Sequence, residues 1–186
     1  MALSQAGAKL ILSARREDEL ERVRQACQSP DQHLVLPLDM SDFDAVALSV
    51  ELARSWSSRL DIVIENAGIS QRSLVKDTLF SVDERIFRVN FLGVIAHTKA
   101  ILPWFLEQGS GHFVVVSSLV GKFATPVRSS YSASKHALHG FFDALRAELY
   151  QEHIDVTLLC PGYIHTQISY NALQGDGSAQ GKLDRA

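Results

Sequence analysis

The sequence predicts an α/β domain built around a parallel β-sheet. Short runs of apolar and β-branched residues alternate along the chain with longer segments whose apolar residues recur at helical spacing. Each predicted strand is almost continuously apolar, which is typical of a parallel sheet with helices on both faces. The chain has 186 residues, of which 46% are hydrophobic, enough for one sizeable core. We therefore predict a single domain over residues 1–186.

The expected elements follow one another in a regular order. Predicted strands cover residues 9–12, 33–38, 62–64, 113–116 and 156–159. Predicted helices cover residues 17–27, 43–56, 82–106 and 131–152. Ser41 and Asp42 are the predicted caps of the second helix, because their side-chain oxygens can accept the orphan N–H groups of its first turn. This alternation predicts a Rossmann-like, doubly wound sheet, in which ligands bind at the carboxyl ends of the strands.

Composition argues against several classes of function. The net charge is −3 and no block of basic residues occurs, so we predict no nucleic-acid partner. The longest apolar stretches are strand-length and are broken by charges, so we predict no membrane span in this chain. Cys27 and Cys160 are too few for a disulfide framework, which indicates free thiols in a reducing compartment. The histidines do not occur at ligand spacing, so no metal site is predicted.

One pattern indicates proton-transfer chemistry. Tyr131 and Lys135 lie four residues apart at the start of a predicted helix, and therefore on one helix face. A free tyrosine has a pKa of about 10, and a nearby cation lowers that pKa by favouring the phenolate. Ser118, at the end of the preceding strand, can hold a carbonyl or alcohol oxygen beside the phenol. An isolated Tyr–Lys pair is more often an ordinary solvated helix face, so the neighbouring motifs decide between the two interpretations.

Those neighbouring motifs resemble one known family. Asn66-Ala67-Gly68 follows the strand at 62–64, Asn90 stands in a Val-Asn-Phe-Leu-Gly sequence, and Cys-Pro-Gly-Tyr-Ile-His-Thr spans 160–166. Together with the serine, tyrosine and lysine, these motifs match the order and spacing of the short-chain dehydrogenase/reductase family. The resemblance covers almost the whole chain. Within the family, the motifs are most similar to the dehydrogenase/reductase member 7 branch.

The resemblance implies an oxidoreductase that interconverts a hydroxyl and a carbonyl on a hydrophobic small molecule of steroid, retinoid or lipid type. Tyr131 would exchange a proton with the substrate oxygen, which Ser118 would hold. Lys135 would lower the pKa of the tyrosine and bind the nicotinamide ribose. Asn90 would anchor a water that relays protons from the lysine towards bulk solvent.

The resemblance also implies NADP(H) as the cofactor. NAD-specific members carry an acid after the first strand present here, whereas this chain has Ser13-Ala14-Arg15-Arg16, whose arginines would bind the 2′-phosphate. Alternatively, these arginines begin a helix and pair with surface acids. Glu65 stands where the family usually has asparagine, so its carboxylate would weaken cofactor binding or point to solvent. The implied cofactor residues are Ser13, Arg15, Arg16, Asp39, Met40, Asn66, Ala67, Gly68, Tyr131, Lys135, Pro161, Gly162, Ile164 and Thr166.

The family's first strand and glycine-rich turn, which bind the cofactor pyrophosphate, have no counterpart in this sequence. Residues 1–8 resemble instead the last turns of the helix that follows them. That strand lies at the centre of the family's sheet, so we expect a gap between two halves of the sheet. The family's last helices and strand also lack a counterpart, and we interpret the chain as truncated at both ends.

Two functions from different classes follow. The first is the oxidoreductase described above. The second is a noncatalytic product that does not bind cofactor and acts as a partner-binding remnant. The family further implies a homodimer or homotetramer formed by the long helices, with burial of those helices in a monomer as the alternative. It also implies a cytoplasmic location, with association with the endoplasmic reticulum membrane suggested by full-length relatives.

Overall fold

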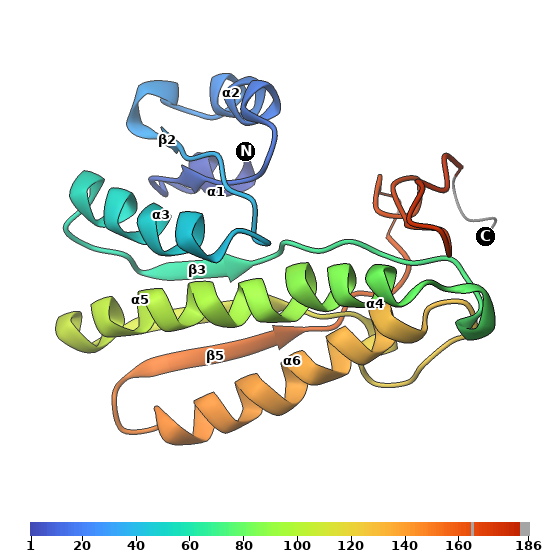
Figure 1. Cartoon of the computed structure of the whole chain (residues 1–186). Helices are drawn as coiled ribbons and strands as arrows, with labels where there is room; N and C mark the ends of the chain where they lie inside the picture. Colours follow the sequence, from blue (N-terminus) through green and yellow to red (C-terminus); the bar gives the residue numbers. More distant parts are fainter. Residues whose placement is uncertain (165, 183–186) are drawn as a thin grey trace.

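A computed structural model describes residues 1–164 and 166–182 of the chain (Figure 1). The described residues form two parallel sheets. β1 (Ile11–Leu12) pairs with β2 (Leu34–Val35), and β3 (Ile62–Glu65), β4 (Gly111–Val116) and β5 (Ile154–Leu159) form a second sheet in the order β3-β4-β5. The predicted α/β class with parallel strands is confirmed.

The five strands do not join into one continuous sheet. Within the described part of the chain, β1 pairs with β2 alone and β3 pairs with β4 alone. The expected gap therefore lies between β1 and β3. Each of these strands has an edge on which its backbone N–H and C=O groups make no strand pairing, and such edges are prone to association.

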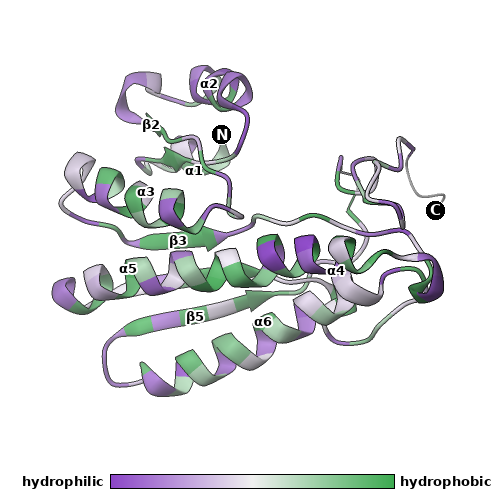
Figure 2. Cartoon of the chain, in the orientation of Figure 1, coloured by the Kyte–Doolittle hydropathy of each residue, from purple (hydrophilic) through white to green (hydrophobic). Residues whose placement is uncertain are grey.

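Six α-helices connect these strands in the described residues: α1 (Ala2–Gln5), α2 (Glu17–Gln25), α3 (Phe43–Trp56), α4 (Phe80–Phe87), α5 (Val94–Gln108) and α6 (Ser129–Glu148). Three short 3₁₀ turns cover Pro30–Gln32, Val75–Asp77 and Leu119–Gly121. Figure 2 shows α2 as mainly hydrophilic and β3 as mainly hydrophobic, as expected for a surface helix and a core strand.

Asp42 caps α3 by accepting a hydrogen bond from the Ala45 N–H at 3.1 Å. Ser41, the other predicted cap, instead donates its hydroxyl to Asp39 at 2.7 Å.

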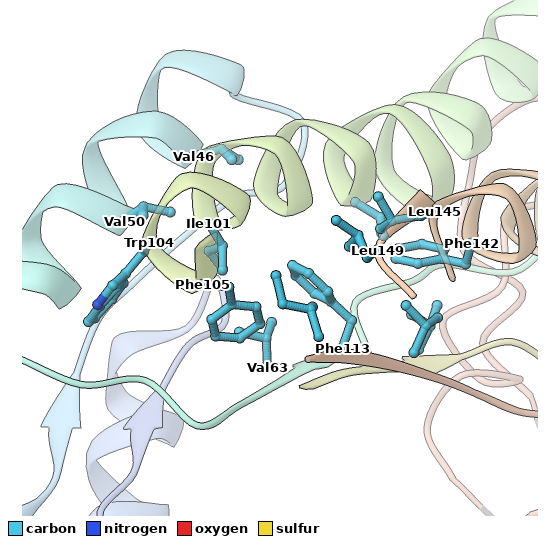
Figure 3. Packing of buried hydrophobic residues seen from close by; sticks show 14 of the residues in the cluster. Val46, Val50, Val63, Ile101, Trp104, Phe105, Phe113, Phe142, Leu145 and Leu149 are labelled. Atoms are coloured by element: carbon cyan, nitrogen blue, oxygen red, sulfur yellow. The ribbon is translucent and has the colours of Figure 1, made fainter. Parts of the chain in front are cut away.

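The core lies where α3, α5 and α6 meet the larger sheet. Phe105 of α5, Phe113 of β4 and Phe142 of α6 are fully buried and point toward one another in Figure 3. The ring centroids of Phe105 and Phe113 are 4.8 Å apart, within the range of favourable aromatic pairs. On the opposite face of the same sheet, Ile62, Ile64 and Leu159 are exposed. The packing therefore fixes one side of the sheet much more firmly than the other.

α4, a π-helical segment at Arg88–Gly93 and α5 form one continuous helix from Phe80 to Gln108. By length and composition alone, this helix of 29 residues is long and apolar enough to cross a membrane, which the short apolar runs of the sequence did not indicate. One such helix does not establish a membrane span, so the absence of a span stays a prediction. Of the most apolar window of this helix, 39% is buried, and Val94, Ile101 and Phe105 lie in the core. A core helix of a globular domain has the same properties.

Candidate active site

Ser118 and Tyr131 meet at the carboxyl end of β4. Ser118 is the second residue after the end of β4 and caps a 3₁₀ turn, where its Oγ accepts a hydrogen bond from the Val120 N–H at 3.3 Å. Tyr131 is the third residue of α6 and is buried. The Ser118 hydroxyl is near enough to the Tyr131 phenol to act to lower its pKa. A substrate oxygen beside them can therefore contact both groups.

The electrostatic setting of Tyr131 differs from the sequence prediction. Burial raises the pKa of the phenol, and this effect outweighs the hydrogen bond with Ser118, which lowers the pKa. The positive charges of Arg128 and Arg72 also act to lower it. The predicted lowering of the tyrosine pKa by Lys135 is wrong for this structure, because the amine is directed to a backbone carbonyl of β4.

Lys135 is buried, and its Nζ donates a hydrogen bond to the carbonyl of Val116 at 2.8 Å. Burial lowers the pKa of the amine to about 8. An ammonium group has three donors, and within the described residues this is the one hydrogen bond that Lys135 Nζ makes. A Cβ added to Gly68 would lie 3.6 Å from Nζ, so the amine sits directly beside the turn that follows β3. The spare donors fit hydroxyl acceptors such as those of a ribose.

Asn90 lies in the π-helical segment, a feature that the sequence did not predict, and is fully buried. Its Oδ1 accepts from the Ile69 N–H at 2.8 Å, and its Nδ2 donates to the Ile69 carbonyl at 2.9 Å and to Ser134 Oγ at 3.1 Å. Asn90 therefore ties the turn after β3 to α6, the helix of Tyr131 and Lys135. Such π-helical segments often occur at functional sites.

A cavity of about 330 Å³ lies between the ends of the two sheets. Its lining includes seven of the predicted cofactor residues, Ser13, Arg15, Asp39, Met40, Asn66, Ala67 and Gly68. Arg16 is not part of that lining, although Arg15 is. Arg16 is instead the N-cap residue of α2. The predicted pair of arginines is thus divided, because Arg15 lines the cavity and Arg16 does not.

Asp39 shares this cavity with Arg15. Burial opposes ionisation of the carboxyl, but hydrogen bonds from the Ser41 N–H and hydroxyl and the charges of Arg15 and Arg85 hold its pKa below the usual value. Its Oδ1 accepts both bonds from Ser41, at 2.8 and 2.7 Å. The aspartate therefore fixes the loop after β2 as an anionic wall of the cavity.

Glu65, which is buried, pairs with the half-buried His97, a contact that the sequence did not predict. Glu65 is 3% exposed, and its Oε1 lies 2.8 Å from His97 Nδ1 and 3.4 Å from Thr98 Oγ1. The alternative in which Glu65 points to solvent is therefore wrong. Burial alone would lower the pKa of His97, but the charge of Glu65 and its hydrogen bond raise it. Nothing in the sequence connects a strand end with a helix residue 32 positions later.

This pair leads to a prediction about pH. Because the pKa of His97 is raised in the folded state, its stabilising contribution is complete below the unfolded pKa and is lost as pH rises through the folded value. We expect the free energy of unfolding of the wild type, relative to that of Glu65→Gln, to decrease as pH rises past neutrality. Urea unfolding at a series of pH values measures the difference. Glu152→Gln, at an exposed site, is the control. If the difference in free energy of unfolding between the wild type and Glu65→Gln does not change with pH, the pairing is contradicted.

Ser118 and Tyr131 line a second, smaller cavity of about 110 Å³. Gly162 and Ile164 of the predicted cofactor segment line this cavity too. Pro161 precedes them, and its carbonyl accepts a hydrogen bond from the Leu119 N–H at 3.0 Å, which holds the segment beside Ser118.

Thr166, in the same predicted segment, accepts a hydrogen bond from the Ile168 N–H at 3.3 Å. Within the described residues it lines neither of the two cavities. The predicted cofactor residues thus divide between two neighbouring cavities, and four of them line neither: Arg16, Lys135, Pro161 and Thr166.

The fold and the grouping of these residues agree with the comparison with protein families. The model of the short chain dehydrogenase family matches residues 1–176, and the chain belongs to that family. A dehydrogenase/reductase SDR family protein 7-like of Anopheles gambiae is 46% identical over 97% of this chain and 59% of the relative. Dehydrogenase/reductase SDR family member 7B of Mus musculus is 42% identical over 97% of this chain and 57% of the relative. The predicted resemblance to the member 7 branch is confirmed, and the chain spans somewhat more than half the length of these relatives.

Solved structures support the fold. A short-chain dehydrogenase from Streptomyces avermitilis superposes with a TM-score of 0.85 at 28% identity, over 93% of this chain and 63% of that one. A gluconate 5-dehydrogenase from Burkholderia cenocepacia J2315, solved in complex with NADP and tartrate, has a TM-score of 0.83 at 22% identity, over 90% and 66% of the two chains. The Rossmann-like architecture is therefore confirmed.

Proposed function

We propose that this chain is an NADP(H)-dependent oxidoreductase that interconverts a hydroxyl and a carbonyl on a hydrophobic small molecule of steroid, retinoid or lipid type. Membership of the short-chain dehydrogenase family supports the reaction class. The observation that carries the proposal is that the Ser118 and Tyr131 hydroxyls line one cavity, together with apolar side chains such as Leu119.

The proposed chemistry assigns one task to each residue. Tyr131 donates its phenolic proton to the carbonyl oxygen during reduction, or accepts the alcohol proton during oxidation, while Ser118 holds that oxygen. Lys135 donates its spare N–H groups to ribose hydroxyls. Asn90 holds the turn after β3 in place and orients a water that returns the proton to solvent. The nicotinamide cofactor, when bound, supplies or accepts the hydride.

The cofactor assignment rests on the larger cavity. The Arg15 guanidinium suits a 2′-phosphate, whereas an acid in that place would suit the ribose hydroxyls of NAD. His97 neutralises Glu65, so the carboxylate near this cavity does not repel phosphate groups as an unpaired charge would. The complex of the structurally similar gluconate 5-dehydrogenase with NADP agrees with this choice. We assign Pro161, Gly162, Ile164 and Thr166 to the carboxamide end of the cofactor.

Arg15→Glu is expected to reverse the cofactor preference. Loss of the charge-assisted hydrogen bonds to the 2′-phosphate should weaken NADPH binding by about tenfold or more and leave NADH binding much less affected. Arg16→Glu should have a smaller effect, because Arg16 does not line the cavity. Fluorescence titration with each cofactor measures both affinities. Arg22→Glu, exposed on α2, is the control, and an equal loss in all three variants would contradict the assignment.

Transfer of deuterium tests the reaction itself. NADPH deuterated in its nicotinamide ring is incubated with the chain and a panel of steroid, retinoid and lipid carbonyl compounds, and the alcohols are analysed by mass spectrometry. We expect deuterium on the carbinol carbon of at least one product. If the chain binds NADPH but labels none of the panel, the proposed reaction is wrong.

We further propose that residues 1–186 act as one domain and that the chain self-associates through its long helices. Leu92 and Leu106, at the end of the π-helical segment and in α5, are exposed at 46% and 44%, which would suit a helix-to-helix contact. Sedimentation of the purified chain would show a dimer or tetramer. Fractionation of cells would test the proposed cytoplasmic location against association with the endoplasmic reticulum membrane.

A further inference from the structure

A thiol, an imidazole and a hydroxyl meet near the carboxyl ends of β4 and β5. His139 Nε2 lies 3.7 Å from Cys160 Sγ and 3.0 Å from Ser117 Oγ. Ser117 directly follows β4, Cys160 directly follows β5, and His139 lies in α6. The described linings of the two cavities include none of these three residues. The cluster is therefore separate from the residues of the proposed oxidoreductase reaction.

The Ser117 hydroxyl can serve the imidazole of His139 both before and after the ring gains a proton. Its Oγ lies 3.0 Å from His139 Nε2 and 3.3 Å from the carbonyl oxygen of Lys135. A hydroxyl donates one hydrogen bond and also accepts. Beside the neutral ring it can donate to Nε2, and beside the protonated ring it can donate to the carbonyl and accept from the Nε2–H. Nε2 can thus take up a proton and remain hydrogen-bonded in both states.

The other ring nitrogen of His139 lacks a partner. The residue is 8% exposed, and its Nδ1 is buried with no hydrogen-bond partner in the part of the chain that the structure describes. Leaving a buried polar atom unsatisfied costs about 1–3 kcal/mol, and in native proteins such atoms can mark a redox or catalytic role. A histidine that served only the packing of α6 would not need this cost.

The surroundings of His139 keep its ring neutral. Burial and the charge of Lys122 lower the pKa of the imidazole. His136 and Arg146 act in the same direction, whereas Asp143 acts to raise the pKa. A neutral ring near pH 7 is able to accept a proton from the neighbouring thiol.

Cys160 is the more accessible of the two cysteines. It is half-buried, whereas Cys27 is buried at 6% exposure. The backbone on both sides of Cys160 is fixed, because the carbonyls of Leu159 and Pro161 accept hydrogen bonds at 2.8 and 3.0 Å from N–H groups of the segment after β4. A thiol reacts as its thiolate, so a base beside an accessible thiol makes it a nucleophile.

We propose that Cys160 is a modification site, at which His139 acts as the base and the thiol exchanges with small disulfides such as oxidised glutathione. His139 Nε2 takes the thiol proton, and the thiolate attacks one sulfur of the disulfide. The S–S bond of the reagent breaks as the S–S bond to Cys160 forms, and the released thiolate takes the proton from the imidazolium. The disulfide is the oxidant, so no further reactant is required. This site goes beyond the proposed oxidoreductase function and does not depend on it.

The test is the rate at which oxidised glutathione modifies each cysteine of the whole chain, followed by mass spectrometry of its peptides. Cys160 should react at least about tenfold faster than Cys27, and about threefold or more faster than Cys160 of the urea-unfolded chain. The second comparison separates activation from exposure, because unfolding exposes the thiol fully and removes the base.

His139→Gln removes the base and should slow modification of Cys160 about tenfold or more. His136→Gln, at an exposed position of the same helix, is the matched control and should leave the rate unchanged. Thermal unfolding confirms that each variant is folded, and loosening of the structure would expose Cys160 and accelerate its reaction. An unchanged rate in folded His139→Gln, or a native Cys160 that reacts no faster than in the unfolded chain, would overturn the proposal.

Discussion

Replacement of Tyr131 by phenylalanine is expected to reduce turnover by at least about a hundredfold, because it removes the proposed proton donor and changes little else. The ring stays in its buried position at the start of α6, so the fold should be retained. NADPH affinity should change little, since the proposed ribose contacts come from Lys135. The measurement is the kcat of deuterium transfer in each variant, with cofactor affinity determined in parallel.

The matched control for this change is Tyr150→Phe. Tyr150 carries the same phenol but is 85% exposed beyond the end of α6, so loss of its hydroxyl should leave turnover unchanged. Turnover of Tyr131→Phe close to that of the wild type would exclude Tyr131 as the proton donor. Equal losses in both variants would show that the effect is not specific to the site.

Gly93→Ala is expected to destabilise the chain by about 3 kcal/mol or more. A Cβ at this position would lie 2.1 Å from the backbone carbonyl oxygen of Met40 and 3.0 Å from its carbonyl carbon, so the backbone of the loop after β2 must move. That loop supplies Asp39 and Met40 to the larger cavity, and the variant should therefore bind NADPH poorly as well. Urea unfolding and cofactor titration measure the two effects.

Gly140→Ala provides the comparison within the same chain. Gly140 lies inside α6, and a Cβ there would meet no atom within 4 Å. Alanine in a helix interior is more stable than glycine by roughly 0.5–1 kcal/mol, so this variant should be slightly stabilised. Similar destabilisation by both alanines would mean that the close contact at Gly93 does not hold the two parts of the structure together.

The strands and the positions of Ser118 and Tyr131 could be predicted from the sequence because they depend on local patterns. Apolar runs with helical segments between them determine parallel strands, and the functional motifs directly follow strand ends. The gap between β1 and β3 was expected from the resemblance to the family and not from local patterns. The predictions of the strands and of the two site residues require only the order of residues along the chain.

Features that depend on side-chain contacts between distant segments could not be predicted in this way. The Glu65–His97 pair joins the end of β3 to α5, and the π-helical segment that carries Asn90 looks like ordinary helix in the sequence. The pKa of Tyr131 was predicted from the spacing to Lys135 alone, whereas burial and the direction of the amine decide it in the structure. The separation of Arg15 from Arg16 likewise depends on where α2 begins.

The most direct test of the proposed function is a fluorescence titration of the purified wild-type chain with NADPH. The proposed cofactor cavity and the spare donors of Lys135 predict saturable binding, tighter for NADPH than for NADH and weakened by Arg15→Glu. If no binding is seen at about 1 mM NADPH, the binding free energy is weaker than about −4 kcal/mol. That result would contradict the oxidoreductase function and favour the noncatalytic, partner-binding alternative.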